Sequence, residues 1–556
     1  MYKLYSSLIN NRLNRYIDEN DLIEDEQNGF RKDRSCLDHI FAVSSIIKNR
    51  LALKKHTFAA FIDFQKAFDW IDRDMLLYKL RTYYNVSGKL YNAIRSIYMF
   101  ASARIKLNNM QTEEFSLSSG VKQGDNLSPT LFNLFLNDLA VGIKRLNDGV
   151  LVDDMCVSIL LYADDIILLA PEENKLQNQL DYLYEWCKKW RMSVNISKSQ
   201  IIHFRPTKCK RSEFIWTLGD QNLEVVPKYK YLGVYLNEHM DFSYTADILS
   251  TAASKALGKL RYKLRFLKEC HYSTFTKLYT SCIVPILDYA SAVWGYKNFS
   301  SHDNIQRRAI RYFLGLHRFA ANDMVEGDMG WLPCQNRRFL AMVNYWNRLL
   351  KLEPTRFLYK IFKWNLKFVN YESTWAWEMK SIFSKTNPAC FESLIECDTR
   401  FTYEKLLCQY TEKWNSSRFE KPKLRYFNMY KSTFEPEDYV KSKTLPKRSR
   451  SLFAQFRAST LPLEIETGRY SGTTLENRLC KICGDGEVED EIHFLCHCKT
   501  YTSDRVKLYI QAQQSNANFN ELDDIDKFVF LMSEMQIPVA KFITSSVNIR
   551  NDAIYK

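Results

Sequence analysis

The stretch LLYADDIILLA, residues 160–170, decides how this chain folds and what it can bind. Two apolar runs flank the adjacent acids Asp164 and Asp165, and this pattern predicts a hairpin of two core strands. A buried carboxylate without a partner is costly, and two side by side raise each other's pKa. The pair therefore either binds a hard divalent cation such as Mg²⁺ or occupies an ordinary turn, where Asp is common.

A third acid favours the cation site. The short apolar run FAAFIDF, residues 58–64, predicts a buried strand that carries Asp63 near its end. Two strands of one sheet can bring Asp63 beside Asp164, and such a cluster can hold two cations about 4 Å apart. These cations would bind a triphosphate and activate an attacking hydroxyl. Because side chains alternate along a strand, we expect Asp164 to be a better ligand than Asp165.

Composition points to a nucleic-acid partner. The chain has 556 residues, and 78 Lys and Arg against 64 Asp and Glu give a net charge of +14. Aromatic residues make up 14%, and bases stack on rings while phosphates attract cations. Gly (17) and Pro (13) are scarce, which excludes a collagen-like or mostly disordered chain. Because the sequence has neither a transmembrane apolar run nor a secretory signal, we expect an intracellular protein of the nucleus or cytoplasm, with no membrane partner.

A Cys/His cluster near the end of the chain predicts a metal site. Cys480, Cys483, His493 and Cys498 supply three thiolates and an imidazole, the closed tetrahedral set that structural Zn²⁺ prefers. The spacing after the first pair is looser, so Cys496 or His497 could replace a later ligand. The alternative is a group of free thiols. A closed set leaves no open position, so we expect this zinc not to be catalytic.

Two further segments carry expectations. Residues 229–236, YKYLGVYL, predict one strand. Residues 245–268 predict an amphipathic helix whose Lys and Arg side chains form a basic face. That face fits the phosphate backbone of a duplex and fits a solvated helix surface equally well.

Six segments in order resemble the reverse transcriptase of LINE-type (non-LTR) retrotransposons. They are QNGFRKDRSCLDHI (27–40), FIDFQKAFDWIDRDML (61–76), GVKQGDNLSPTLFNLFLNDL (120–139), LLYADDIILLA (160–170), WRMSVNISKSQIIHF (190–204) and YKYLGVYL (229–236). The resemblance implies an α+β right-hand polymerase with an antiparallel palm sheet and a mostly α-helical C-terminal region that ends in a zinc knuckle. The implied domains are partial fingers (1–55), palm (56–240), helical thumb (241–350), basic helical C-terminal region (351–470) and zinc-knuckle region (471–556).

The resemblance also implies a role for individual residues. Asp63, Asp164 and Asp165 match the catalytic metal ligands, and Phe68 matches the ring that excludes a ribose 2′-OH. The nucleotide site would further include Gln123, Gly124, Lys198 and Arg31, and the primer grip would include Tyr231, Leu232 and Gly233. From the residues alone, Phe68 could be a plain core ring, Gly124 a loop glycine, Lys198 a surface lysine and Arg31 part of a basic loop.

The implied activity is RNA-directed DNA polymerisation. Two Mg²⁺ ions would support transfer of deoxynucleotides from dNTPs to a DNA primer on an RNA template. Full-length members of the family carry an endonuclease domain and further fingers strands before the segment that begins here at Met1, so we expect an N-terminally truncated form. Two rival functions stay open: a nucleic-acid-binding relic without catalysis, and a metal-dependent nuclease that uses the same carboxylates.

Overall fold

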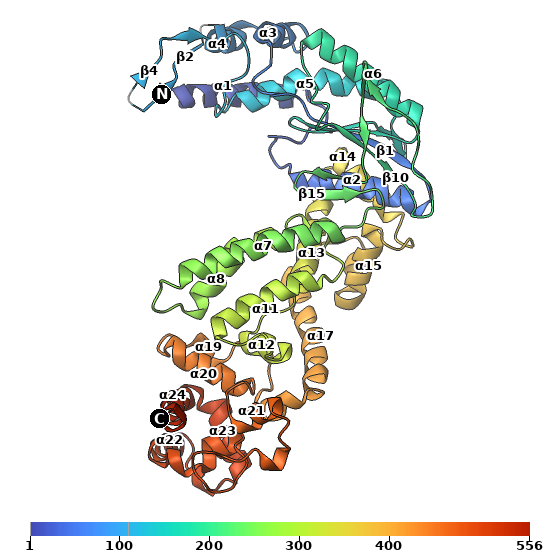
Figure 1. Cartoon of the computed structure of the whole chain (residues 1–556). Coiled ribbons are helices and arrows are strands. Elements are labelled where there is room, and N and C mark those ends of the chain that lie inside the picture. Colours follow the sequence, from blue (N-terminus) through green and yellow to red (C-terminus); the bar gives the residue numbers. More distant parts are fainter. Residues whose placement is uncertain (1, 100, 109, 556) are drawn as a thin grey trace. The chain divides into compact units, whose positions relative to one another are not determined.

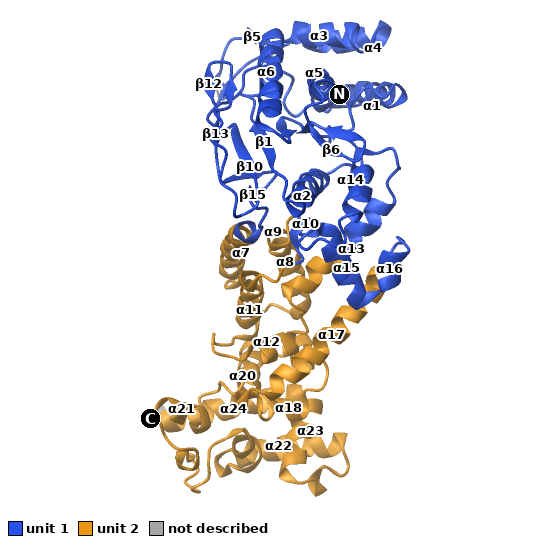
Figure 2. Cartoon of the chain, turned by 90° about the vertical axis from the view of Figure 1, so that its right-hand side faces the viewer, with its two compact units in different colours: residues 1–245, 290–296, 342–397 blue, residues 246–289, 297–341, 398–556 orange. Residues whose placement is uncertain are grey.

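The computed structural model describes residues 2–99, 101–108 and 110–555. The chain folds into two compact units, coloured separately in Figure 2. Unit 1 comprises residues 1–245, 290–296 and 342–397, and unit 2 comprises residues 246–289, 297–341 and 398–556. Each unit is thus assembled from three separate segments of the chain.

Unit 1 is built on a five-stranded sheet with the strand order β13-β10-β1-β9-β8. β1 (Thr57–Ile62) lies in the centre and pairs antiparallel with both β9 (Asp165–Ala170) and β10 (Gln200–Phe204). β8 (Ile159–Tyr162) pairs antiparallel with β9, whereas β13 (Glu224–Val225) pairs parallel with β10. The sheet is therefore mixed, and the expectation of a purely antiparallel sheet is wrong at this edge. All six residues of β1 are buried, which explains its continuous apolar sequence.

Helices and small hairpins complete the first part of unit 1, as Figure 1 shows. Two long helices, α5 (Ser128–Arg145) and α6 (Glu173–Trp190), pack against each other, and each also contacts the sheet. The remaining helices here are α1 (Tyr2–Glu19), α2 (Cys36–Ala52), α3 (Arg73–Thr82) and α4 (Gly88–Met99). Two-stranded pairs are β2 (Ser102–Ala103) with β5 (Phe115–Ser116), β3 (Lys106–Leu107) with β4 (Met110–Gln111), β6 (Val150–Val152) with β7 (Met155–Val157), and β11 (Thr217–Leu218) with β12 (Gln221–Asn222).

Residues 229–236 form a hairpin, so the prediction of one strand is wrong. β14 (Lys228–Tyr231) and β15 (Val234–Asn237) pair antiparallel through the two-residue turn Leu232-Gly233. Both turn residues have positive φ, 44° and 84°, which is the backbone form that matches the twist of a tight hairpin. The left-handed conformation of Leu232 is unfavourable for a residue with a side chain, and this is why its sequence gave no turn signal.

The late segment 342–397 packs with unit 1, although it was expected to divide between a thumb and a C-terminal region. α14 (Phe357–Leu366) packs along α2, and the Trp375 ring of α15 (Trp375–Thr386) lies 5.0 Å from the Phe41 ring of α2. Asp38, fully buried on α2, accepts hydrogen bonds from Tyr345 (3.1 Å) and Arg348 (2.8 Å) of α13 (Cys334–Leu350). These long-range contacts of α2 explain the discontinuous unit.

Unit 2 is helical. Its longer helices are α7 (Ser243–Leu264, which starts in unit 1), α8 (Tyr272–Cys282), α11 (Ser300–Leu314), α12 (Asn322–Met329), α17 (Thr399–Phe419), α20 (Lys447–Arg457), α22 (Thr502–Ser515), α23 (Asp524–Glu534) and α24 (Gln536–Tyr555). Short helices include α9 (Val284–Leu287), α16 (Pro388–Glu392, in unit 1), α18 (Phe427–Tyr430), α19 (Asp438–Lys441) and α21 (Glu464–Tyr470). Across the described residues, none of the helices is long and apolar enough to cross a membrane.

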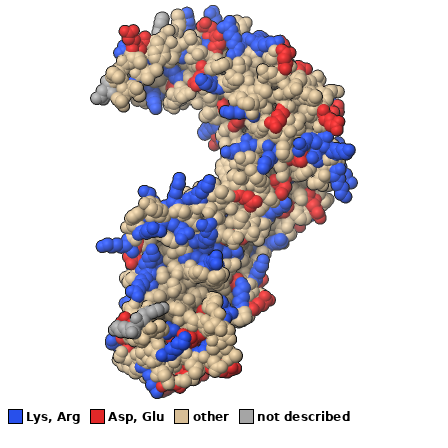
Figure 3. All heavy atoms as spheres, in the orientation of Figure 1, with Lys and Arg blue, Asp and Glu red and all other residues tan. Residues whose placement is uncertain are grey.

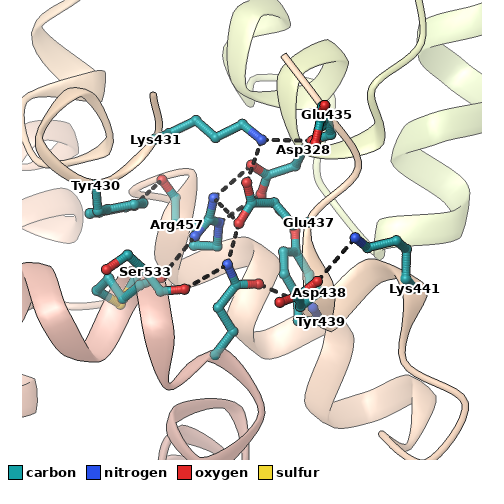
Figure 4. A network of polar contacts seen from close by, with 12 residues as sticks. Asp328, Tyr430, Lys431, Glu435, Glu437, Asp438, Tyr439, Lys441, Arg457 and Ser533 are labelled. Atoms are coloured by element: carbon teal, nitrogen blue, oxygen red, sulfur yellow. Dashed lines mark hydrogen bonds and ion pairs between the residues drawn. The ribbon is translucent and has the colours of Figure 1, made fainter. Parts of the chain in front are cut away.

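A buried polar network joins several helices of unit 2, as Figure 4 shows. Arg457 of α20 donates to both carboxylate oxygens of Asp328 on α12, at 2.7 and 2.8 Å, and both side chains are fully buried. The Tyr439 hydroxyl donates to Asp328 at 2.7 Å, and Arg457 lies 3.2 Å from Glu437, which also pairs with Lys431. Two cations and two anions balance inside the core, as buried charges require.

Candidate active site and metal centre

Strand pairing brings the three predicted acids to one end of the sheet in unit 1. Asp63 follows the last residue of β1, and Asp165 is the first residue of β9. Since Ile62 pairs with Ile166, continuing the antiparallel register by one step places Asp63 across from Asp165. Tyr162 pairs with Asp165, so Ala163 and Asp164 form the turn of the β8–β9 hairpin. Asp63 lies 101 residues before Asp164 in the sequence, and the two meet because β1 and β9 are neighbours.

The negative charge of Asp63 acts on both Asp164 and Asp165. Burial, followed by repulsion from Asp164 and Asp63, raises the pKa of Asp165 to about 6. Burial and Asp63 also raise the pKa of Asp164. Since this charge acts on both acids, the preference for Asp164 as the better ligand stays a prediction. A divalent cation would relieve this repulsion between neighbouring carboxylates.

Lys198 lies at the same cluster. Its ammonium nitrogen is 3.9 Å from a carboxylate oxygen of Asp63, and the Lys198 side chain is 68% exposed. Among the described residues, groups of three or more ligand atoms within 4.8 Å of one another occur in the C-terminal Cys/His region, and Asp63, Asp164 and Asp165 do not form such a closed group. Carboxylates that hold cations on two sides need not all lie that close. The chemistry of the donor set therefore fits hard divalent cations.

Two loops beside the acids carry the predicted nucleotide residues. The amide of Val121 donates to the carbonyl of Phe68 at 2.9 Å, and Gln123 donates to the Asp69 carboxylate at 2.8 Å. These bonds place Phe68, Gln123 and Gly124 on adjoining loops. The half-buried Phe68 ring stacks on Phe132 at 4.3 Å, so its position is fixed by packing. Gly124 has φ +77° and open space where a Cβ would stand, so here glycine serves the backbone conformation.

Arg31 lies within its own loop. Its guanidinium donates to the carbonyls of Glu24 (2.9 Å) and Gln27 (3.2 Å), and burial lowers its pKa to about 10. It also lines a polar cavity of about 400 Å³ together with Lys32 and Arg34. The structure thus gives Arg31 backbone partners that the sequence did not predict.

The β14–β15 hairpin, which holds the predicted primer grip, lies near the acids. Tyr229 of β14 stacks on Phe61 of β1 at 4.4 Å, and burial together with Asp165 and Asp63 raises the pKa of Tyr229 to about 12. Tyr231 is buried, and its hydroxyl lies 3.1 Å from Nδ1 of His39. Leu232 and Gly233 form the tip. Tyr229 was missed as a site residue; its place two residues before Tyr231, on the same strand face, was the available signal.

The four predicted zinc ligands come together in unit 2. The ligand atoms of Cys480, Cys483, His493 and Cys498 all lie within 4.8 Å of one another. Cys483 Sγ is 3.5 Å from His493 Nε2, while His493 Nδ1 is 2.8 Å from the Glu487 carboxylate. A histidine that binds zinc commonly donates its second nitrogen to such a carboxylate, which fixes the ring. The donor set therefore fits Zn²⁺.

The two alternative ligands lie outside this set of four. Cys496 is buried, and that burial raises the pKa of its thiol to about 12. His497 Nε2 lies 3.1 Å from the Asp524 carboxylate. Among the described residues it belongs to a second possible group of metal ligands, together with Glu487 and His493. Glu487 is the residue of this centre that sequence reasoning missed; a lone acid six residues before a histidine gives no signal.

The predicted basic helix is α7. Its exposed Lys and Arg side chains belong to the cationic surface that Figure 3 shows over α7 and α8. The Tyr312 ring of α11 lies under two cations, Arg261 of α7 at 4.9 Å and Lys447 of α20 at 5.6 Å. The exposed basic residues of α7 and the turn after it are Lys255, Lys259, Arg261, Lys263, Arg265 and Lys268.

The mixed sheet with acids at the end of its central strand and in the adjoining hairpin defines a nucleic-acid polymerase fold. Residues 1–236 match the family model of the reverse transcriptase (RNA-dependent DNA polymerase). The matched residues are thus similar to a reverse transcriptase domain, and the chain is similar to the RNA-directed DNA polymerases of Drosophila mobile elements.

Individual relatives support this assignment. The chain is 27% identical over 318 residues to the probable RNA-directed DNA polymerase from transposon BS of Drosophila melanogaster. The matched region covers 56% of this chain and 34% of that protein. It is 27% identical over 301 residues to the polymerase from mobile element jockey of Drosophila funebris, covering 53% and 32%. The matched part thus spans about a third of these relatives. A telomerase from Candida tropicalis matches remotely, with a TM-score of 0.35 and 11% identity over 74% of this chain and 61% of that one.

Proposed function

We propose that the chain is an RNA-directed DNA polymerase that transfers deoxynucleotides from dNTPs to the 3′-OH of a DNA primer on an RNA template. The observation that carries the proposal is the meeting of Asp63 with Asp164 and Asp165 at one end of the sheet. It occurs inside the domain that matches reverse transcriptases. In this proposal unit 1 includes the palm, and α7 belongs to the thumb.

The three carboxylates would hold two Mg²⁺ ions, which supply activation of the primer hydroxyl and charge neutralisation at the departing pyrophosphate. Lys198, whose ammonium nitrogen lies 3.9 Å from a carboxylate oxygen of Asp63, would offset negative charge on the phosphates. Phe68 is held by its stack on Phe132, so it would present a rigid edge to a ribose 2′-OH and exclude ribonucleotides. Gly124 would let the backbone approach the nucleotide or template.

The partners follow from the charged surfaces. The β14–β15 hairpin with Tyr231, Leu232 and Gly233 would support the primer end. Tyr229 of the same hairpin lies close enough to Asp165 and Asp63 for their charges to raise its pKa. The basic face of α7 would contact phosphates of the template–primer duplex, a salt-dependent interaction. We further propose that Cys480, Cys483, His493 and Cys498 bind one structural Zn²⁺.

Primer extension with single carboxamide variants tests the polymerase. Asp63→Asn and Asp164→Asn should each slow extension more than about 100-fold, beyond the loss typical for a residue that merely orients a metal ligand. Both should still bind template–primer in a gel shift, because they leave the cationic surfaces unchanged. The matched control is Asp154→Asn, which changes an exposed acid in the β6–β7 turn of the same unit and should extend normally.

Each rival function predicts a different result. If the wild-type protein binds template–primer but does not extend it at saturating Mg²⁺ and dNTP, the chain is a nucleic-acid-binding relic without catalysis. Degradation of the nucleic acid without dNTPs would indicate the nuclease. Extension by Asp63→Asn at the wild-type rate would contradict the two-metal assignment.

A further inference from the structure

One segment of unit 1 touches the acidic turn without contributing an acid. Residues 22–29, which we call the strap, run beside β8: Asn28 donates to the carbonyl of Leu161 at 2.9 Å, and Leu161 donates to the carbonyl of Glu26 at 3.0 Å. The strap therefore extends the edge of the β8–β9 hairpin toward its turn.

Gln27 then reaches the turn itself. Its side chain is buried, and its Oε1 accepts hydrogen bonds from the amides of Ala163 (3.1 Å) and Gly29 (2.9 Å). Ala163 precedes Asp164 and has φ +56°, a left-handed conformation that is unfavourable for a residue with a Cβ. A conformation of this kind persists only where its surroundings hold it. The Gln27 amide supplies such a hold.

Gly29 makes the close approach possible. A Cβ at Gly29 would stand 2.2 Å from the amide nitrogen of Ala163 and 2.9 Å from its Cα. These are backbone atoms of the acidic turn, so any side chain at position 29 would have to push the turn away. The glycine is therefore required by contact with Ala163 and not by its own backbone angles.

The strap is in turn fixed to one face of α5. Asn133 donates to the Gly29 carbonyl at 2.7 Å, Asn137 bonds to both Leu22 and Glu24 at 2.8 Å, and Lys144 pairs with Glu24 and Glu26. The three α5 residues are spaced by four and seven positions and so share a helix face. Arg31 closes the loop from its other side through the Glu24 and Gln27 carbonyls.

We propose that Gln27 and Gly29 are positioning residues that hold the Ala163–Asp164 turn in the conformation in which its carboxylates bind divalent cations. The inference rests on the proposed function and deepens it. Neither residue touches the metal or the nucleotide in this proposal; each acts through the backbone of Ala163. The strap residues would thus set the affinity of the acidic cluster for its cations.

The test compares two buried glutamines in the full chain. Gln27→Met keeps side-chain length and removes the acceptor. The control Gln179→Met removes an equally buried glutamine whose Nε2 donates to the carbonyl of Leu169 on β9, away from the turn. Mn²⁺ binding is measured by titration, with Asp164→Asn defining the component bound at the acidic cluster, and the half-saturating Mg²⁺ concentration is measured in primer extension.

We expect Gln27→Met to weaken Mn²⁺ binding about 10- to 100-fold and to raise the half-saturating Mg²⁺ similarly, the range seen when residues that orient metal ligands are lost. Gln179→Met should change neither value, and template–primer affinity should be the same in both. Should Gln27→Met fail to fold, Asn133→Ala should show a smaller shift in the same direction. Equal shifts in both glutamine variants, or no shift in Gln27→Met, would overturn the inference. Wild-type protein that neither binds Mn²⁺ nor extends a primer would instead refute the proposed function.

Discussion

Removing one partner of the buried Arg457–Asp328 pair should destabilise unit 2 strongly. Arg457→Met leaves Asp328 and Glu437 facing Lys431 alone, and Asp328→Leu leaves Arg457 and Lys431 facing Glu437. Each variant creates one uncompensated charge in a region where both side chains of the pair are 0% exposed. Breaking such a pair costs about 3–5 kcal/mol, a large fraction of the stability of a typical domain.

The double variant separates this charge effect from simple loss of packing. With both Arg457 and Asp328 replaced by apolar residues, Glu437 and Lys431 still balance each other. The double variant should therefore cost clearly less than the sum of the two single variants, because apolar replacement of a complete buried pair is often close to neutral. An exposed pair on α17 gives the control: Arg400 is 87% exposed, and Arg400→Met should cost less than about 1 kcal/mol.

Thermal unfolding and hydrogen exchange measure the effect. For a unit of about 250 residues, 3–5 kcal/mol corresponds to a fall in Tm of about 6–20 °C. Peptides from α12 and α20 should lose exchange protection first, since these helices carry the pair. The charge-balance argument would be refuted if the single variants had the same Tm as the Arg400→Met control. It would also be refuted if the double variant lost as much stability as the two single variants together.

Four further outcomes follow from the sites. Because the pKa of Asp165 is raised to about 6, its carboxyl group loses its proton only near that pH, and Mn²⁺ affinity should increase as the pH rises through about 6. A pH titration of Mn²⁺ affinity in Asp165→Asn should lack this increase. By the same linkage the metal-free protein should lose stability as pH rises from the ordinary Asp range through about 6, because the folded state binds that proton more tightly than the unfolded one does. Phe68→Ala should admit ribonucleotides, seen as extension with rNTPs, while unchanged rejection of rNTPs would make Phe68 a packing residue. Chelation of Zn²⁺, or Cys483→Ser, should lower the Tm of unit 2 and raise exchange in residues 480–498, and equal Tm with and without chelator would exclude a structural metal.

Sequence patterns predicted the local elements of this molecule but did not predict the contacts between residues far apart in the chain. The strand around Phe61, the hairpin around Ala163 and the Cys480–Cys498 cluster all lie where sequence periodicity and spacing put them, because each depends on residues close in the chain. The Leu232–Gly233 turn was missed since its first residue adopts a conformation that its type disfavours.

Contacts between distant residues escaped prediction for a different reason. The role of Gln27 depends on an amide 136 residues away. The division into units was missed because α2 is covered by helices that follow it by about 300 residues. Patterns within a short window carry no information on such pairings.

This order along the chain has a consequence for biosynthesis. A ribosome releases α2 long before it has made α13, α14 and α15, and every residue of α2 from Asp38 to Asn49 is buried in the finished protein. At a synthesis rate of about 5–20 residues per second, that apolar surface waits on the order of tens of seconds for its cover. The nascent chain should therefore depend on chaperones during this interval, and a messenger that ends before α14 should yield an aggregating product.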